Sequence, residues 1–539
     1  MIKISVAQER HKVESSALDA SGPLVGTYVG RLDLAHILAF VGRLAVPMVL
    51  AIAMVAGGSL RLWRLNGAGF NSDEAVYAGQ AAALAGDPDI SRFFPIFRAH
   101  PMLVQFLLSI MFRVQVSDVA ARLLVVAIGM ATILLIYKLG ALLYDERIGA
   151  VAALLVALMP YHVVVTRQVL LDGPLTFCTT LTLYLVARFA ISQQPRFLYA
   201  TAASLGLVFL AKETGFVLVA AVYAFLALTP QIRVRIRDLV LSAIVMFVPI
   251  AVYPMSTALA GRSDTAKGYL VWQLFRRSNH EWTFFPTVVP PAIGPLVLIT
   301  AAAGLWLLRG ERTWRETLLV AWIVVPCVVF QLWPVKGFQY LLPVAPAVAV
   351  LAGRTLIRWP AVRTIGWGRF SVPTVALRIA AVGVIALSLT STTGDRLQPP
   401  ASGTLLAGAG GTPGGRETGA WIQTNTPENS VFLTVGPSMA NIIQFYGHRK
   451  AYGLSVSPNP LHRNPSYQPV RNPDLSVRSG DAQYIVFDVF SSSRSIYFTE
   501  RIKKLIERYD GRIVHTEYLP GTSPDEGVEP IIIVYEVYP

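Results

Sequence analysis

The sequence contains little charge and little cysteine. Only 14% of its 539 residues are charged, against about 25% in an ordinary soluble protein. Hydrophobic residues make up 54%, so neither a disordered chain nor a soluble enzyme of this length fits the composition. The two cysteines, Cys178 and Cys327, exclude a disulfide framework. Both lie in apolar runs, where a small buried side chain is expected.

Several motifs of enzymes and pumps are also missing. The sequence has no Walker A loop, no His-Glu-x-x-His or Cys-x-x-Cys metal motif and no Gly-x-Ser-x-Gly elbow. A nucleotide-driven pump is therefore not expected. No cofactor is expected either, although a divalent metal stays open. The first 33 residues lack the apolar core of a cleavable signal peptide, so we expect the first span to remain as an anchor.

Long apolar runs dominate the sequence instead. A helix needs about 20 apolar residues to cross a bilayer, and charged residues lie at the ends of these runs and hardly at all inside them. We therefore predict a polytopic α-helical membrane protein with eleven spans. The runs lie near 35–57, 118–143, 149–165, 173–191, 198–211, 215–229, 239–255, 291–308, 317–333, 340–357 and 375–391.

The distribution of basic residues predicts the orientation. The chain has 46 Lys and Arg against 32 Asp and Glu, a net charge of +14. Cytoplasmic loops collect Lys and Arg, and the Arg-rich short loops fall on the cytoplasmic side if the N-terminus is inside. Membrane lipids and phosphates are the expected partners, and nucleic acid is not, because no basic cluster is interleaved with aromatics. We predict a multi-pass protein of the plasma membrane.

Four regions follow from this topology. Residues 1–33 form a cytoplasmic tail, and residues 34–391 form a transmembrane domain with outer loops at 58–117 and 256–290. A Gly-, Pro-, Ser- and Thr-rich linker at 392–415 leads to an extracytoplasmic α/β domain at 416–539. In that domain strands are predicted at 431–435, 484–490, 512–518 and 531–537, and helices at 417–423 and 499–509.

The first outer loop contains two short apolar segments with helical patterns. Asn71 to Leu84 fits a helix that Asn71 caps, with Glu74 at the third helical position, as in a capping box. Pro101 to Arg113 fits a second helix with Pro in its first turn. Neither segment reaches spanning length, so both should lie along the membrane surface.

Two acids on the outer face are the candidate catalytic residues. Asp73 begins the first short helix, where a carboxylate could take a proton from an attacking hydroxyl or amine. Asp172 lies at the outer end of the fourth span and could orient the same acceptor. Each has a structural alternative. Asp73 and Glu74 also suit the dipole at a helix start, and Asp172 could cap its helix or pair with Arg167.

Polar residues near the same face are the candidate substrate contacts. Adjacent arginines can hold a phosphate bidentately, and a Lys with a nearby Tyr suits the same group. Structural alternatives stay open, namely a cap for His100, an ion pair between Lys212 and Glu213, and interfacial anchoring for the rest. The predicted substrate-binding residues are Glu74, His100, Arg167, Lys212, Arg276, Arg277, Lys336 and Tyr340.

Four local patterns resemble the C-type membrane glycosyltransferases that use polyprenyl-phosphate sugars, in the branch of protein O-mannosyltransferases and lipid A aminoarabinose transferases. The Asp73-Glu74 pair resembles the Asp-Glu motif of their first outer loop, and His100-Pro101 resembles their His-Pro or Lys-Pro motif. The segment 167–174 resembles the one that bears their second acid, here Asp172. The segment 336–346 resembles Lys-x-x-Arg-Tyr-Leu-Leu-Pro, with Gln339 in place of the usual Arg.

The resemblance covers roughly residues 40–360 and implies a reaction. A sugar would pass from a polyprenyl-phosphate donor to an acceptor on the outer face, with inversion and without a nucleotide donor. The resemblance assigns Asp73 as the base for the acceptor and Lys and Arg as the groups that stabilise the departing phosphate. The acceptor stays open among protein, lipid and glycan.

Two other functions stay open from the sequence. A transporter or flippase for a lipid-linked or anionic solute should show mid-membrane acids and related halves, whereas the notable acids here lie near one face. A scaffold whose outer domain recruits a partner would leave the four matched patterns unexplained.

Overall fold

A computed structural model describes residues 34–96, 100–359, 364–367, 370–398, 412–519 and 528–539. By its contacts the chain divides into a unit of residues 1–45 and a unit of residues 46–539. The predicted tail at 1–33 lies outside the described residues, and so do residues 399–411 of the predicted linker. The domain boundaries drawn from the sequence stay predictions.

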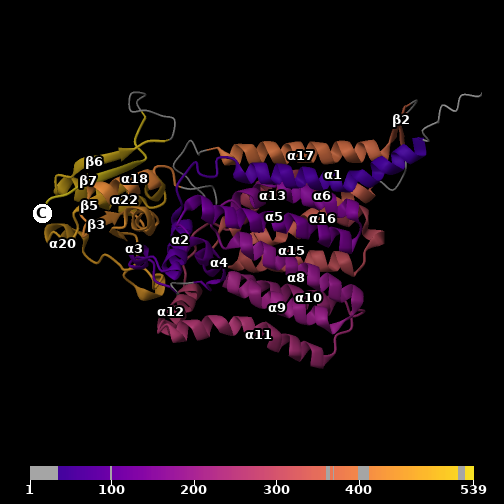
Figure 1. The fold of residues 1–539 in the computed structure, drawn as a ribbon, viewed down its shortest axis with the longest axis horizontal. Helices are drawn as coiled ribbons and strands as arrows, with labels where there is room; N and C mark the ends of the chain where they lie inside the picture. The colour runs from indigo at the N-terminus through magenta and orange to yellow at the C-terminus, as the bar shows by residue number, and fades with distance from the viewer. Residues whose placement is uncertain (1–33, 97–99, 360–363, 368–369, 399–411, 520–527) are drawn as a thin grey trace, which may run out of the picture. The chain divides into compact units, whose positions relative to one another are not determined.

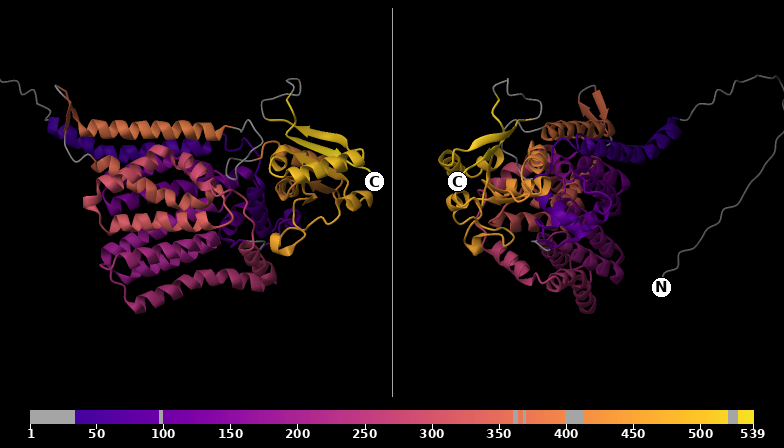
Figure 2. Two further views of the ribbon diagram at one scale, coloured as in Figure 1. Left: turned by 180° about the vertical axis from the view of Figure 1, so that it is seen from behind. Right: turned by 60° about the vertical axis from the view of Figure 1, so that its left-hand side comes forward.

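All eleven predicted apolar runs fall in helical parts of the chain, as expected for a polytopic membrane fold. Figures 1 and 2 show helices such as α5, α8, α15 and α16 running alongside one another. The helices of these runs are α1 (Leu34–Leu62), α5 (Asp118–Leu143), α6 (Glu146–Leu158), α7 (Pro160–Val165), α8 (Asp172–Ser192), α9 (Pro195–Ala211), α10 (Val217–Leu228), α11 (Ile236–Leu259), α14 (Pro295–Leu307), α15 (Trp314–Leu332), α16 (Ala345–Arg358) and α17 (Thr374–Leu397).

Within the described residues, seven helices are long and apolar enough to cross a membrane, or eight if α13 (Phe284–Ile293) and α14 form one bent span. The axes of that pair differ by 93°, at Gly294, whose φ of 100° suits glycine. The run at 149–165 is divided at Pro160, where α7 begins. Helices α9 and α10 have 17 and 12 residues. The polytopic fold is confirmed, whereas eleven spans stay a prediction.

The two short helices of the first outer loop are α2 (Ser72–Ala85) and α4 (Leu103–Phe112). The Asn71 side chain accepts hydrogen bonds from the backbone of Asp73 and Glu74, and Glu74 accepts one from the Asn71 backbone, so the predicted capping box is present. Helix α4 begins at Leu103 after Met102, so Pro101 precedes the helix instead of lying in its first turn. The position of both helices along a membrane surface stays a prediction.

Shorter elements complete the membrane region. A two-stranded antiparallel hairpin, β1 with β2, connects α16 to α17 and has no counterpart in the sequence prediction. The short elements are α3 (Pro88–Ser91), η1 (Glu213–Phe216), α12 (Ser263–Leu274), η2 (Arg309–Glu311), η3 (Phe338–Val344), β1 (Thr364–Trp367) and β2 (Phe370–Pro373).

The C-terminal region is an α/β domain, as predicted, around a five-stranded sheet of order β4-β3-β5-β7-β6. The strands are β3 (Val431–Thr434), β4 (Lys450–Gly453), β5 (Tyr484–Asp488), β6 (Arg512–Glu517) and β7 (Ile532–Glu536). The helices are α18 (Gly415–Asn425), α19 (Pro437–Ile442), η4 (Ile443–Gly447), η5 (Pro460–His462), α20 (Pro473–Arg478), α21 (Val489–Ser492) and α22 (Ile496–Arg508). Strand β4 was missed, because four residues carry little alternation.

Both faces of this sheet are covered. Strand β3 pairs in parallel with β4 and β5, while β7 is antiparallel to β5 and β6. Side chains alternate between the two faces of a strand, so Phe432 lies in one apolar cluster and Leu433 in the other. Figure 1 shows α18 and α22 beside the strands.

The C-terminal domain is bonded to the first outer loop. The Tyr446 hydroxyl donates to Asp118 at the start of α5, and Arg416 pairs with the same carboxylate at 2.9 Å. Asn441 donates to the Ser72 hydroxyl at 3.0 Å, at the start of α2. The C-terminal domain therefore contacts the turn that carries Asp73.

Candidate active site

Helix α2 presents its two adjacent acids to different surroundings, because successive helical residues differ by about 100° around the axis, given 3.6 residues per turn. Asp73 is half-buried. Burial raises the pKa of its carboxyl, nearby Lys212 and His100 oppose that rise, and Asp172 adds to it. No described residue donates a hydrogen bond to this carboxylate. Asp73 thus has a raised basicity and open acceptor capacity, which are the properties of a general base.

Asp172 and Lys212 form a buried ion pair beside Asp73. Lys212 Nζ lies 2.9 and 2.8 Å from the two carboxylate oxygens of Asp172. Asp172 is the first residue of α8, and Lys212 ends α9 as its C-cap. Burial alone would lower the pKa of Lys212, but Asp172, Tyr340 and Glu213 together outweigh burial and raise the pKa above its ordinary value. The alternative pairing of Asp172 with Arg167 is wrong, because Asp172 pairs with Lys212 and the Arg167 guanidinium donates to the Trp63 carbonyl instead.

Glu213 pairs with His100 and not with its neighbour Lys212. His100 Nδ1 lies 2.8 Å from Glu213 Oε2, and the Tyr269 hydroxyl donates to Glu213 Oε1 at 3.2 Å. Burial alone would raise the pKa of Glu213, but His100 and Lys212 outweigh it and hold the pKa at about 2. Glu213 is therefore an anion at any physiological pH, and it fixes the imidazole that faces Asp73.

A chain of side chains on α12 extends this network to Arg276. Gln273 donates to the Tyr269 hydroxyl at 2.6 Å, and Arg276 donates to the Gln273 side chain at 3.1 Å. The Arg276 guanidinium also lies 4.4 Å from the centre of the Trp272 ring. Arg276 is near enough to Asp73 to lower the pKa of that carboxyl. Gln273 and Trp272 thus position the cation near the candidate base.

Aromatic rings surround the charged groups. Lys212 Nζ lies 4.9 Å from the Tyr340 ring centre, and the Tyr77 and His100 rings are 5.9 Å apart. Burial raises the pKa of Tyr77 and of Tyr269, so both hydroxyls stay protonated. Desolvation of this kind strengthens every charge interaction in the site.

We call this set the Asp73 cluster. The structure brings six of the predicted site residues together in it: Asp73, His100, Asp172, Lys212, Arg276 and Tyr340. The prediction missed Tyr77, Glu213, Tyr269 and Gln273 as members. The spacing of Tyr269 and Gln273 was a usable signal, since residues four apart share one face of a helix.

Glu74 has a larger structural role than the predicted capping box. Its carboxylate accepts a bidentate pair of bonds from Arg122 at 2.9 Å each. It also accepts backbone bonds from Asn71 and Val169 at 3.0 Å, and it is fully buried. All four bonds are internal, so Glu74 fixes α2 against α5 and presents no free oxygen to a substrate. Substrate binding by Glu74 is not supported.

The other predicted contacts lie at the margin of the Asp73 cluster. Arg167 donates to the Trp63 carbonyl. Lys336 is buried, with Nζ 3.3 Å from the Trp333 carbonyl and 5.6 Å from the Trp282 ring centre. Arg277 is exposed on the segment after α12. Their roles with substrate stay predictions.

A pocket of about 300 Å³ adjoins the cluster. Glu213 and Tyr269 line it together with Phe209, Tyr253 and Leu270. Its wall is mainly apolar, so an apolar part of a substrate fits there next to the charged groups.

In the part of the chain that the structure describes, no three His, Cys, Asp or Glu side chains converge as metal ligands would. That the chain needs no cofactor stays a prediction, and a requirement for a divalent metal stays open.

The chain is similar to known membrane transferases. Residues 99–257 match the family model for dolichyl-phosphate-mannose-protein mannosyltransferase. ArnT from Cupriavidus metallidurans, solved with undecaprenyl phosphate, is 15% identical over 91% of this chain and 97% of its own, with a TM-score of 0.63. Its apo state is 13% identical over 92% and 98%, with the same TM-score of 0.63.

A second similar structure is archaeal. The oligosaccharyltransferase AglB from Archaeoglobus fulgidus, solved with an inhibitory peptide and a dolichol-phosphate, is 14% identical over 88% of this chain and 73% of its own, with a TM-score of 0.58. No curated protein sequence matches the chain. The chain thus has the fold of ArnT and AglB, and this fold together with the partial family match supports the superfamily predicted from the sequence motifs.

Proposed function

We propose that the chain is an integral-membrane glycosyltransferase that moves a sugar from a polyprenyl-phosphate donor to an acceptor, with inversion, on the outer face of the plasma membrane. The observation that carries the proposal is the Asp73 carboxylate, which has a raised pKa and lies among Lys212, His100 and Arg276. One base surrounded by cations suits a reaction in which a hydroxyl loses a proton and a phosphate leaves. The family match over residues 99–257 supports the same class of reaction.

The proposed reaction is a single displacement. The acceptor oxygen or nitrogen attacks the anomeric carbon, and its proton passes to Asp73. The bond between that carbon and the phosphate oxygen breaks, and the lipid phosphate leaves with the electron pair. Attack from the face opposite the leaving group inverts the anomeric carbon.

The cations of the cluster have two separate tasks in this proposal. Arg276, which lies on the outer segment after α11, and the neighbouring Arg277 receive the developing phosphate charge. Lys212 neutralises Asp172 and also favours the charged form of Asp73. Preorganised cations in a desolvated site stabilise the leaving group without reorganisation in the transition state.

Sugar transfer by the purified full chain from a labelled polyprenyl-phosphate sugar is the direct test. The wild type should form a product of opposite anomeric configuration, which NMR of the released glycan reports. Retained configuration would overturn the inverting mechanism while leaving the transferase intact. A transporter or flippase, the alternative function, would move the lipid between leaflets and form no product.

Donor binding tests the phosphate contacts. Charge-assisted hydrogen bonds contribute roughly 1.5–3 kcal/mol, so Arg276→Gln should weaken the affinity for a polyprenyl phosphate by about one to two decades. Arg262→Gln is the matched control, because Arg262 is an exposed arginine on the same outer segment. Equal losses in both variants would indicate general attraction to the lipid surface.

The orientation has its own test in intact cells. After Cys178 and Cys327 are replaced by Ala, Ser479→Cys reports on the C-terminal domain and Gln194→Cys on the loop between α8 and α9, and both positions are exposed. An impermeant thiol reagent should label residue 479 and not residue 194. The opposite pattern would place the Asp73 cluster in the cytoplasm.

The proposed reaction also needs an acceptor for the sugar. We propose a hydroxyl or amine on a protein, lipid or glycan of the cell envelope. Mass spectrometry of glycoproteins, glycolipids and wall glycans with and without the protein identifies the class that loses the sugar.

A further inference from the structure

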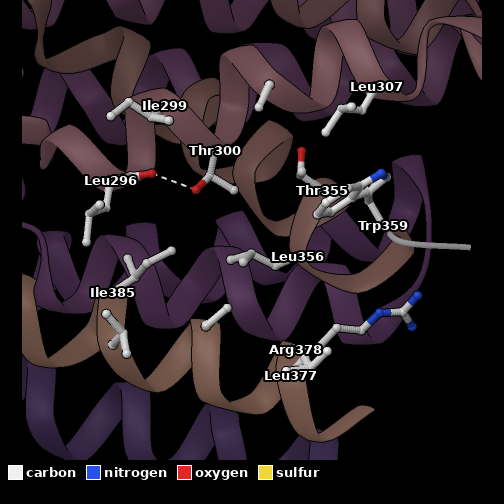
Figure 3. A pocket seen from close by; sticks show the side chains of 13 residues that line it. Leu296, Ile299, Thr300, Leu307, Thr355, Leu356, Trp359, Leu377, Arg378 and Ile385 are labelled. Carbon is white, nitrogen blue, oxygen red and sulfur yellow. Dashed lines mark hydrogen bonds between the residues drawn. The ribbon is translucent and has the colours of Figure 1, made fainter. Parts of the chain in front are cut away.

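A second pocket lies between α14, α16 and α17, away from the Asp73 cluster. Its volume of about 500 Å³ falls in the range of about 300–1,000 Å³ that is typical of ligand sites. It extends along α14 from Leu296 to Leu307, which is about 16 Å at the helical rise of 1.5 Å per residue. Figure 3 shows apolar side chains of three helices directed into this space.

The wall of the pocket is apolar along most of its length. The hydroxyls of Thr300 and Thr355 donate to the carbonyls of Leu296 and Leu351 at 2.6 and 3.0 Å, so they are satisfied within their own helices. The remaining wall includes Ile299, Leu356 and Ile385. A polar ligand would leave unpaired groups against this wall, which costs free energy, whereas a hydrocarbon chain fits it.

One end of the pocket differs from the rest. Arg378 and Trp359 lie at the end near Leu307, and Leu296 lies at the opposite end (Figure 3). Arg378 donates to the Arg358 carbonyl at 3.3 Å, which holds the guanidinium near this end. Tryptophan is enriched at the headgroup level of membrane proteins, and arginine binds phosphate.

The charge around this end is positive. Arg358 and Arg354 share the Glu311 carboxylate at 3.4 and 3.8 Å. The three linked arginines, Arg354, Arg358 and Arg378, outnumber the acids Glu311 and Glu316 that pair with them. An anionic headgroup therefore complements the polar end while a hydrocarbon chain fills the rest.

This end is far from the Asp73 cluster. Tyr340 of the cluster precedes α16, and Arg358 ends it. The 14 residues of α16 span about 21 Å at 1.5 Å per residue. A donor phosphate that reaches Asp73 cannot also contact Arg378, so the occupant of the second pocket is a separate lipid molecule.

We propose that this pocket binds one acyl chain of an anionic membrane phospholipid, with the lipid phosphate against Arg378. Under the predicted orientation this headgroup belongs to the cytoplasmic leaflet, opposite the catalytic face. The bound chain fills the space between α14 and α17 and holds both helices against α16. The inference depends only on the membrane position of these helices and not on the transferase reaction.

Titration of the purified chain with phosphatidylglycerol and phosphatidylcholine tests the proposal, with thermal stability and native mass spectrometry as readouts. Phosphatidylglycerol should raise the Tm saturably and with higher affinity than phosphatidylcholine. Arg378→Gln should weaken phosphatidylglycerol binding by about one decade, as expected for one charge-assisted contact, and should weaken phosphatidylcholine binding less, because the choline cation offsets the charge of its phosphate. Ala381→Phe, which fills the pocket, should weaken both lipids, and Ala303→Leu is the milder variant if Ala381→Phe does not fold.

Matched controls separate a built site from general attraction. Arg237→Gln removes an exposed arginine of α11, and Ile379→Phe enlarges an exposed residue of α17 that does not line the pocket. Both should titrate as the wild type. The proposal fails if Arg237→Gln and Arg378→Gln lose equal affinity, if the filling variants bind as the wild type, or if a polyprenyl phosphate displaces phosphatidylglycerol preferentially.

Discussion

Buried charges gather at both ends of α16. Near its start lies the Asp73 cluster. Near its end, Arg354 and Glu316 form an ion pair at 3.1 Å, and Tyr144 donates to the same Glu316 oxygen at 2.6 Å. The other Glu316 oxygen accepts from the Thr313 backbone at 2.7 Å.

The two clusters differ in whether the carboxylate oxygens have hydrogen-bond donors. Every carboxylate oxygen of Glu316 is held by the protein, and the residue is buried. Asp73 is half-buried, and charges surround it at electrostatic range without a hydrogen bond from a described residue. A buried carboxylate whose oxygens are both bonded stabilises one conformation, whereas an open carboxylate can accept a proton. The comparison separates a structural cluster from a reactive one.

The largest expected effect tests Asp73 itself. General-base catalysis contributes about 10²–10⁴-fold, so Asp73→Asn should lower turnover by at least about two decades. Asn keeps the size and the helix-start preference of Asp, so the Tm and the donor affinity should persist. Turnover and Tm of the purified variant are the measurements, with Asp89→Asn, an exposed acid of the same loop, as control. Near-normal turnover would remove Asp73 from the reaction.

Glu316→Gln should give the opposite result. Breaking a buried ion pair costs about 3–5 kcal/mol of stability, since the remaining charge is left without its partner. The Tm should fall, while turnover per folded molecule stays near the wild-type value. Glu74→Gln should lower the Tm for the same reason, although it adjoins Asp73. A loss of turnover with an unchanged Tm in Glu316→Gln would show that both clusters are reactive.

The dependence of turnover on pH should show an effect of intermediate size that distinguishes Asp73 from Glu316. Asp73 acts when deprotonated, so turnover should fall as the pH drops through its raised pKa. Lys212→Met removes a charge that lowers the pKa of Asp73. The fall should therefore begin at a higher pH in this variant, by about one pH unit for an interaction of about 1.4 kcal/mol. A profile that coincides with the wild type would separate Lys212 from the titration of Asp73.

The smallest effect concerns the outer domain. Tyr446→Phe removes the hydroxyl that donates to Asp118 and accepts from the Phe70 backbone at 2.7 Å. One hydrogen bond contributes about 0.5–1.5 kcal/mol, so we expect a small decrease in Tm and in turnover. Chemical denaturation and transfer assays measure both. A loss as large as that of Asp73→Asn would place the outer domain in the catalytic step.

Several features of the fold could be predicted because they are local. The capping box of α2 needs only Asn71 and Glu74, three residues apart. Likewise, β3 and β5 were predictable from short runs of residues that favour strands. The span count was less predictable, because a kink at Pro160 or a bend at Gly294 changes the length of a helix without changing the apolar character of the run.

The sequence predicted many of the residues that form the site, but it did not predict which of them pair with each other. Asp172 and Lys212 are 40 positions apart, and His100 and Glu213 are 113 apart. Sequence neighbours suggested Arg167 for Asp172 and Lys212 for Glu213, but the packing of α8 against α9 selects other partners. Tyr77 and Tyr269 were missed because the burial of α2 and α12 depends on elements that pack against them in the folded chain.

The sequence by itself determined that this is a polytopic membrane protein with a C-terminal α/β domain, because apolar run length and composition are properties of short segments. It also determined the order of the motifs that carry the candidate acids. Only the tertiary structure decided that Glu74 is bonded to Arg122 while Asp73 stays open. The physical reason is that the environment of a carboxylate depends on charges and burial contributed by helices distant in sequence.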